Sequence, residues 1–268
     1  MITTIDTPSP NFSQRPEGVM PDMIVIHYTD MPTAFDALTH LQKPESQVSA
    51  HYLIDEEGQV YKIVEEENRA WHAGVSYWDK RENINDHSIG IELANPGHSN
   101  GYVPFPAPQM KALSKLCKDI IRRRGILPHN IVGHSCIAPG RKQDPGHLFD
   151  WKWLADQGVG CWPALQGAVG RSTERLETLQ GAVGRSTERL EKESKDYLNS
   201  DKIEERDLLR LFVKYGYHPE LPFEDLMEAF ARRFQPEKIE QDKTEPDQET
   251  FDILNALIRS KLNSRKRS

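Results

Sequence analysis

The 268-residue sequence has little of several features that would place it in a specialised class. Its three cysteines, Cys117, Cys136 and Cys161, are too few and too odd in number for a disulfide framework. No apolar run reaches transmembrane length, and the opening MITTIDTPSPNFSQRP lacks the basic and apolar parts of a signal peptide. The net charge of −7 disfavours a general nucleic-acid binder, which normally presents a basic face. We therefore expect a soluble globular protein without a transmembrane segment or a nucleic-acid partner.

What is present divides the chain by composition. Residues 1–163 mix short apolar runs with turns and hold all five tryptophans and nine of the ten histidines. Residues 164–195 are repetitive, and residues 196–268 are charged and helix-rich. We predict an N-terminal extension over 1–21, a main domain over 22–163, a linker over 164–195 and a small C-terminal module over 196–268.

The main domain alternates strand and helix patterns. Apolar, β-branched runs predict buried strands, and two alternating runs around a glycine predict a hairpin. A one-sided apolar pattern closed by Gly125 predicts a helix. The expected elements are strands over Met23–Thr29, Ser88–Asn95 and Asn130–His134, a hairpin over His51–Val64 and a helix over Pro106–Gly125. This mixture predicts an α/β fold, with a central mixed sheet flanked by helices.

The linker contains a near-perfect duplication. LQGAVGRSTERLET (Leu165–Thr178) is followed by LQGAVGRSTERLEK (Leu179–Lys192), identical at 13 of 14 positions. Apolar and small residues recur at alternating spacings of four and three, which indicates one seam of a helix. The segment is interpreted as a duplicated helical linker, with a docking or dimerising helix as the alternative.

Beyond the linker, the pattern predicts a three-helix module. The three helical stretches are Ile203–Tyr215, Phe223–Phe234 and Gln248–Leu262. YGYHPELP, rich in glycine and proline, separates the first two. A module of this size is marginally stable alone, so we expect it to lean on the rest of the chain.

Polar residues interrupt two of the apolar strands and fill one rigid loop. His27 lies within MIVIHYT, Glu92 lies within SIGIELAN, and VGHSCIAPGRKQDPGH carries His134, Lys142 and Asp144. A histidine or carboxylate in so apolar a run is costly to bury without a partner. Imidazole and carboxylate suit Zn²⁺, and a catalytic zinc takes three protein ligands.

These residues have the types needed for metal-assisted hydrolysis of an amide. His27, His134 and Asp144 would be ligands, Glu92 a general base and Lys142 the cation beside a developing oxyanion. The alternatives stay open at this point: each histidine can be a structural strand residue, and Glu92 and Lys142 can be solvated. The pattern alone does not identify a substrate.

Four segments resemble the zinc-dependent N-acetylmuramoyl-L-alanine amidases, the AmpD and AmiD family, which is related to peptidoglycan-recognition proteins. The segments are VIHYT, QVSAHYLIDEEGQVYKIVEEENRAWHAG, NDHSIGIEL and GHSCIAPGRKQDPG, in family order over about 22–160. SPNFSQRP and Tyr28, which follows the first expected ligand, are similar to the AmiD-type branch. Cys136 departs from the usual HSDIAP motif and is an alternative soft ligand.

The resemblance implies one zinc ion bound by His27, His134 and Asp144, with Glu92 as the catalytic acid/base and Lys142 assisting. It implies hydrolysis of the amide between N-acetylmuramic acid and L-alanine, in peptidoglycan or in anhydro-muropeptides. Residues 22–163 would be the catalytic domain. Residues 196–268 would be a peptidoglycan-binding-like module, although Arg232 and Arg233 stand where such modules are often amide-rich.

The resemblance also suggests substrate contacts and a compartment. We expect Trp71, His72 and Tyr28 to bind substrate. The AmiD-type likeness favours the cell envelope, periplasm or secretion, with the cytoplasm as the alternative. Two rival functions remain: a non-catalytic peptidoglycan-recognition protein on the same fold, and a zinc peptidase that cuts the stem peptide, although HExxH is absent. The oligomeric state is not predicted.

Overall fold

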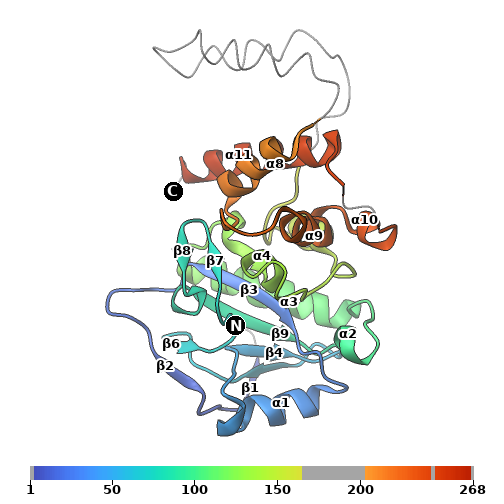
Figure 1. Ribbon diagram of the computed structural model, residues 1–268. Coiled ribbons are helices and arrows are strands. Elements are labelled where there is room, and N and C mark those ends of the chain that lie inside the picture. The colour runs from blue at the N-terminus through green and yellow to red at the C-terminus, as the bar shows by residue number, and fades with distance from the viewer. Residues whose placement is uncertain (1–2, 165–202, 243–244, 267–268) are drawn as a thin grey trace.

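The computed structural model describes residues 3–164, 203–242 and 245–266 (Figure 1). The strands are β1 (Thr4–Asp6), β2 (Phe12–Gln14), β3 (Met23–Tyr28), β4 (Tyr52–Ile54), β5 (Val60–Lys62), β6 (Asn68–Ala70), β7 (Tyr77–Trp78), β8 (Arg81–Glu82), β9 (Ser88–Leu93) and β10 (Ile131–Gly133). The α-helices are α1 (Ala34–Gln42), α2 (Gly97–Asn100), α3 (Ala107–Arg124), α4 (His134–Ile137), α5 (Trp151–Asp156), α8 (Glu205–Tyr215), α9 (Phe223–Phe234), α10 (Pro236–Glu240) and α11 (Gln248–Arg265). Short 3₁₀ turns are η1 (Pro44–Ser46), η2 (Ile84–Asp86) and η3 (Pro128–Asn130).

The main sheet is mixed, as predicted. Within the described residues its order is β1-β5-β4-β9-β3-β10. Strands β4, β9, β3 and β10 run parallel to one another, whereas β4 and β5 form the expected antiparallel hairpin. Because β9, β3 and β10 are adjacent and parallel, their carboxyl ends meet at one edge of the sheet, where ligands commonly bind in α/β folds.

The two faces of this sheet differ in composition. In β3, Met23, Val25 and His27 point to one side, called here the front face, and they pair in register with Ser88, Gly90 and Glu92 of β9. The alternate residues of both strands point to the back face, because side chains alternate along a strand. The front face therefore passes from apolar residues at the strand starts to polar residues at the strand ends.

The back face packs on α3, where the sequence predicted a helix. Ile24, Ile89 and Ile91 share a core with Leu113 and Ile120 of α3. The helix ends at Gly125, whose φ of 68° is left-handed and whose N–H donates to Ile121 O at 2.8 Å. A glycine accepts this conformation without strain, which explains the stop.

The C-terminal helices cover the start of the front face (Figure 1). Met23 and Val25 belong to one buried cluster with Phe212 of α8, Phe230 of α9 and Leu257 of α11. Trp78, at the end of β7, is fully buried in this cluster and makes edge contacts with Tyr215 and Tyr217. The C-terminal residues are thus part of the same core as the sheet.

Arg233 of α9 contacts β10, the edge strand of the sheet. Its side chain is 2% exposed, donates to Ile131 O of β10 at 2.9 Å and stacks 4.2 Å from the centroid of the Trp151 ring. Its guanidinium also lies 3.8 Å from Cys136 Sγ. Its hydrogen bond and stacking stabilise the contact between α9 and β10.

The predicted fold class is confirmed, although details differ. His134 was expected at the end of a strand but is the first residue of α4, directly after β10, because the chain turns helical there. The short helix α10 was not predicted, because its five residues are too few to show a helical apolar pattern. The duplicated segment, Leu165–Lys192, lies outside the described residues, and the domain boundaries stay predictions.

No helix in the described parts of the chain has the length and apolar character needed to cross a membrane.

Candidate active site

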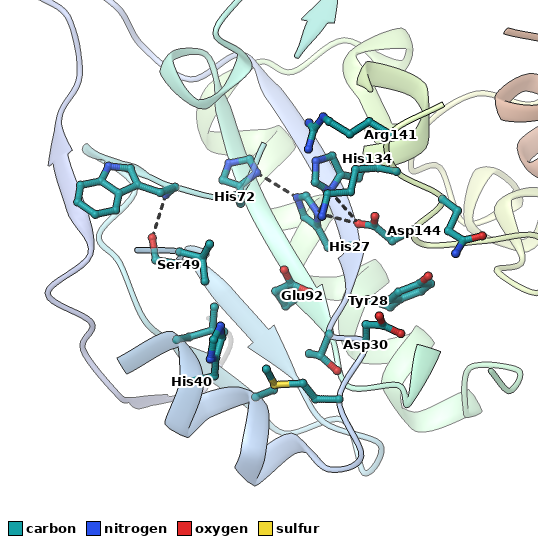
Figure 2. Close-up of a pocket in the computed structure, with 18 residues that line it drawn as sticks. His27, Tyr28, Asp30, His40, Ser49, His72, Glu92, His134, Arg141 and Asp144 are labelled. Atoms are coloured by element: carbon teal, nitrogen blue, oxygen red, sulfur yellow. Dashed lines mark hydrogen bonds and ion pairs between the residues drawn. The ribbon is translucent and has the colours of Figure 1, made fainter. Parts of the chain in front are cut away.

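His27, His134 and Asp144 converge at the carboxyl ends of β3 and β10 (Figure 2). His27 Nδ1 lies 3.0 Å from His134 Nδ1 and 2.9 Å from Asp144 Oδ2, and His134 Nδ1 lies 3.0 Å from the same oxygen. His27 is the next-to-last residue of β3, and His134 follows β10, so the parallel pairing of these strands brings the rings together. Asp144 comes back from the loop after α4.

This arrangement fits a metal ion. Three ligand atoms at bonds of about 2.0–2.2 Å in a tetrahedral shell lie roughly 3.3–3.6 Å apart, a little more than the separations found here. Burial, with His134, lowers the pKa of His27 to about 4. Neutral imidazoles and an ionised carboxylate are the forms that bind metals. The three buried side chains form a group able to hold a metal ion.

The outer ring nitrogens of both histidines have partners. His134 Nε2 lies 3.1 Å from Ala73 O, and His27 Nε2 lies 3.0 Å from His72 Nδ1. Metal-binding histidines usually donate this second N–H, which fixes the ring orientation. The site therefore has the outer support that a metal centre needs.

Glu92 lies beside this group on the front face. It is the register partner of His27, so both side chains leave the sheet on the same side. Burial, followed by the Asp144 charge, raises the pKa of Glu92 well above its usual range, and Lys142 opposes the shift. Its Oε2 is buried and has no hydrogen-bond partner among the described residues. An unpartnered buried oxygen of this kind is available to a ligand.

Two basic residues stand at the rim. Lys142 is exposed and lines the pocket together with Glu92 and Asp144. Arg141 donates to Ala73 O at 2.7 Å and Val75 O at 2.6 Å, which ties the loop that carries Asp144 to the segment after β6. Arg141 was not predicted from the sequence, because its hydrogen bonds join positions far apart in the chain.

The pocket extends from the three converging side chains to α1 and has a volume of about 350 Å³. Trp71 lines it, with its ring Nε1 3.3 Å from Ser13 Oγ of β2. Tyr28 lines it too, and its hydroxyl lies 2.7 Å from His98 Nδ1. Pockets of this size hold small ligands and substrate fragments. The predicted substrate contacts of Trp71 and Tyr28 stay predictions with suitable positions.

His72 differs from the other two residues expected to bind substrate. Although it lines the pocket, both of its ring nitrogens have protein partners: His27 Nε2 lies 3.0 Å from Nδ1, and Ser88 Oγ lies 3.2 Å from Nε2. A role behind His27 suits this placement better than a substrate contact. Ser88 and Gly90 were not predicted as site residues either. Their alternation with isoleucine in SIGIEL does indicate a strand with one face of small and polar residues.

Cys136, the alternative soft ligand, faces away from the three ligand candidates. It is 1% exposed, and its Sγ lies 3.8 Å from Arg233 Nη1 of α9. The group that can hold a metal in the described residues consists of His27, His134 and Asp144. Cys136 therefore belongs to the core under the C-terminal helices.

Comparisons with known proteins agree with this geometry. Residues 16–147 match the family model described as N-acetylmuramoyl-L-alanine amidase. The chain is 36% identical over 259 residues to the N-acetylmuramoyl-L-alanine amidase AmiD of Escherichia coli K12, covering 88% of this chain and 82% of that protein. It is 38% identical over 168 residues to the 1,6-anhydro-N-acetylmuramyl-L-alanine amidase AmpD of Enterobacter cloacae, covering 56% of this chain and 88% of that protein.

Solved structures give the same relationship. AmiD from E. coli, in complex with the substrate anhydro-N-acetylmuramic acid-L-Ala-D-γ-Glu-L-Lys, superposes with a TM-score of 0.69 at 33% identity over 92% of both chains. AmpDh3 from Pseudomonas aeruginosa, in complex with an anhydromuramic pentapeptide, superposes with a TM-score of 0.71 at 30% identity over 97% of this chain and 99% of that one. The enzyme class predicted from the sequence is confirmed, and this chain belongs to the N-acetylmuramoyl-L-alanine amidase family.

Proposed function

We propose that this chain hydrolyses the amide bond between the lactyl group of N-acetylmuramic acid and L-alanine, using a zinc ion held by His27, His134 and Asp144. The observation that carries the proposal is the Glu92 carboxylate, which lies without a partner for Oε2 in the same pocket as the three ligands. Family membership and the muropeptides bound by AmiD and AmpDh3 support the substrate class. The two-histidine, one-carboxylate donor set supports zinc.

A zinc ion in this site supplies Lewis acidity, which makes a water molecule a nucleophile near neutral pH and polarises a carbonyl oxygen. Glu92 takes the proton from the attacking water and returns it to the leaving alanine nitrogen, which then departs as an amine. Glu92 is partly buried, and its Oε2 is shielded from solvent, which suits this role, because burial favours a carboxyl group that can hold a proton between the two transfers.

Lys142 places a positive charge at the rim of the same pocket. The charge stabilises the oxygen of the scissile carbonyl as it becomes negative, where a positioned cation lowers the barrier most. Trp71 and Tyr28 also line the pocket, and their rings offer surface against which the sugar and the start of the peptide pack. Binding across the three ligands then brings the lactyl carbonyl within reach of Glu92.

The two rival functions differ from this one in their products. A recognition protein on this fold binds the muropeptide and releases nothing, and the complete set of His27, His134, Asp144 and Glu92 argues against it. A peptidase on the stem peptide releases fragments that begin after L-alanine. The proposed amidase releases the whole stem peptide with L-alanine at its amino terminus.

The test is mass spectrometry of purified muropeptides after incubation with zinc-loaded protein, with chelated protein and with the Glu92→Gln variant. We expect free stem peptide beginning at L-alanine from the zinc-loaded protein alone. Parallel digests of anhydro-muropeptides and muropeptides with a reducing end measure which sugar is preferred. Fragments cut within the stem would establish the peptidase instead, and bound muropeptide with no cleavage by the zinc-loaded protein would establish the recognition protein.

A further inference from the structure

We propose that His72 and Ser88 form a hydrogen-bonded chain that fixes His27 as the Nε2–H tautomer, so that its Nδ1 lone pair points to the metal before the metal arrives. The inference rests on the metal site of the proposed function and adds two positioning residues to it. Neither residue is one of the three ligand candidates. The chain runs from Ile84 O through Ser88 Oγ and the His72 ring to His27, with every link on the front face of β9 or beside it.

The direction of each bond follows from its first link. Ser88 Oγ lies 2.7 Å from Ile84 O, and a carbonyl can only accept, so the single hydroxyl proton goes there. Ser88 Oγ must then accept from His72 Nε2 at 3.2 Å, which places the proton of the neutral His72 ring on Nε2. His72 Nδ1 is left with a lone pair that accepts from His27 Nε2–H at 3.0 Å. In a neutral His27 the remaining lone pair is on Nδ1, the atom facing Asp144 and His134.

Ala73, which follows His72 in the sequence, orients the second ligand candidate, His134, in the same way. Ala73 O accepts from His134 Nε2–H at 3.1 Å, which leaves the His134 Nδ1 lone pair for the metal. Asn85 of η2 holds this segment in place, since its Oδ1 accepts from both His72 N at 3.0 Å and Ala73 N at 2.8 Å. One short segment, supported by one 3₁₀ turn, therefore orients both imidazoles.

Gly90 provides the space for this arrangement. A Cβ atom at Gly90 would stand 2.4 Å from Cγ of the His72 ring, closer than atoms can approach. His72 therefore lies directly against the bare backbone of β9, between Ser88 and Glu92. This close contact holds the ring plane in the orientation that both hydrogen bonds need.

The first measurement is histidine ¹⁵N–¹H correlation NMR of the metal-free full chain at neutral pH, which distinguishes the two imidazole tautomers. We expect His27, His72 and His134 all as Nε2–H. The His27→Gln and His72→Asn spectra assign the signals. A His27 ring that carries its proton on Nδ1 in the metal-free protein would overturn the proposal, whatever the enzyme turns out to hydrolyse.

The second measurement is zinc affinity by competition with a chromophoric chelator. His72→Ala removes the acceptor of His27 Nε2–H, and we expect zinc binding to weaken by about 10–100-fold. His72→Asn keeps an acceptor oxygen close to the Nδ1 position and is expected to restore most of that affinity. Ser88→Ala removes only the acceptor of His72 Nε2–H, so its loss of zinc affinity is expected to be smaller than that of His72→Ala.

His129→Ala is the matched control, because His129 is a buried histidine in η3, on the side of the protein that faces Lys261 of α11. We expect it to leave zinc affinity unchanged. Circular dichroism identifies any variant that fails to fold. Folded His72→Ala with wild-type zinc affinity, or a loss that His72→Asn does not repair, would contradict the proposal. Absence of zinc binding by the unmodified protein contradicts the proposed function instead and leaves the tautomer measurement standing.

Discussion

The front face of the central sheet has two ends with opposite properties. At the start of β3, Met23 and Val25 are fully buried under the C-terminal helices. At its end, His27 stands beside Glu92, whose Oε2 has no partner among the described residues. Both ends belong to the same pair of strands. The comparison shows that the C-terminal helices stabilise one end, while the other end keeps polar groups that water or a ligand must satisfy.

The largest expected difference between the two ends comes from Glu92→Gln. We expect kcat to fall by about 10²–10⁴-fold, because the amide cannot transfer the proton. The free energy of unfolding is expected to stay the same or rise, since burying an unpartnered carboxylate is unfavourable. Release of stem peptide and urea unfolding measure the two quantities. A clear fall in the free energy of unfolding would mean that the Glu92 side chain stabilises the core, as Met23 does.

Arg233→Ala tests the opposite end of the face. We expect a destabilisation of about 2–5 kcal/mol, because the change opens a cavity over Trp151 and removes the donor to Ile131 O. Arg233→Met, which fills the volume without a charge, is expected to lose much less. Both variants should keep wild-type zinc affinity when folded. Weakened zinc binding in a folded Arg233→Ala protein would show that the two ends are coupled.

Lys142→Ala tests the polar end of the front face, at the rim of the pocket. We expect kcat to fall by about 10²–10³-fold through lost stabilisation of the oxyanion. The free energy of unfolding should change by less than about 0.5 kcal/mol, because the side chain is exposed. Lys152→Ala, which alters an exposed lysine of α5, is the control and should change neither quantity. A rise in KM at constant kcat would assign Lys142 to binding alone.

The smallest effect is expected from Trp71→Ala. Loss of part of the pocket wall is expected to raise KM about fivefold, equivalent to about 1 kcal/mol of apolar contact, with kcat nearly unchanged. Ser13→Ala, which removes the partner of the indole Nε1, should raise KM less. Steady-state kinetics on a soluble muropeptide measures both. An unchanged KM in Trp71→Ala would place Trp71 in the structural wall rather than in the binding site.

Several features of the site could be predicted from the sequence. His27 and Glu92 stood out because each interrupts an apolar strand, and the loop after β10 concentrated His134, Lys142 and Asp144 in a few residues. The residues around them could not be predicted. Ser88, Gly90 and Asn85 are ordinary strand and turn residues until their side chains are placed beside His72, and Arg141 bonds to carbonyl groups nearly seventy positions away.

The sequence by itself determined the local structure of this protein and the residue types of the group that can hold a metal ion. Apolar periodicity specifies strands and helices, and Gly125 ends α3, because these effects act over a few neighbouring residues. Only the tertiary structure decided that β3, β9 and β10 run side by side in parallel, which brings His27, Glu92 and His134 to one edge. It also decided that His72 lies behind His27 and that Arg233 is buried against Trp151, since such contacts depend on packing between segments distant in the chain.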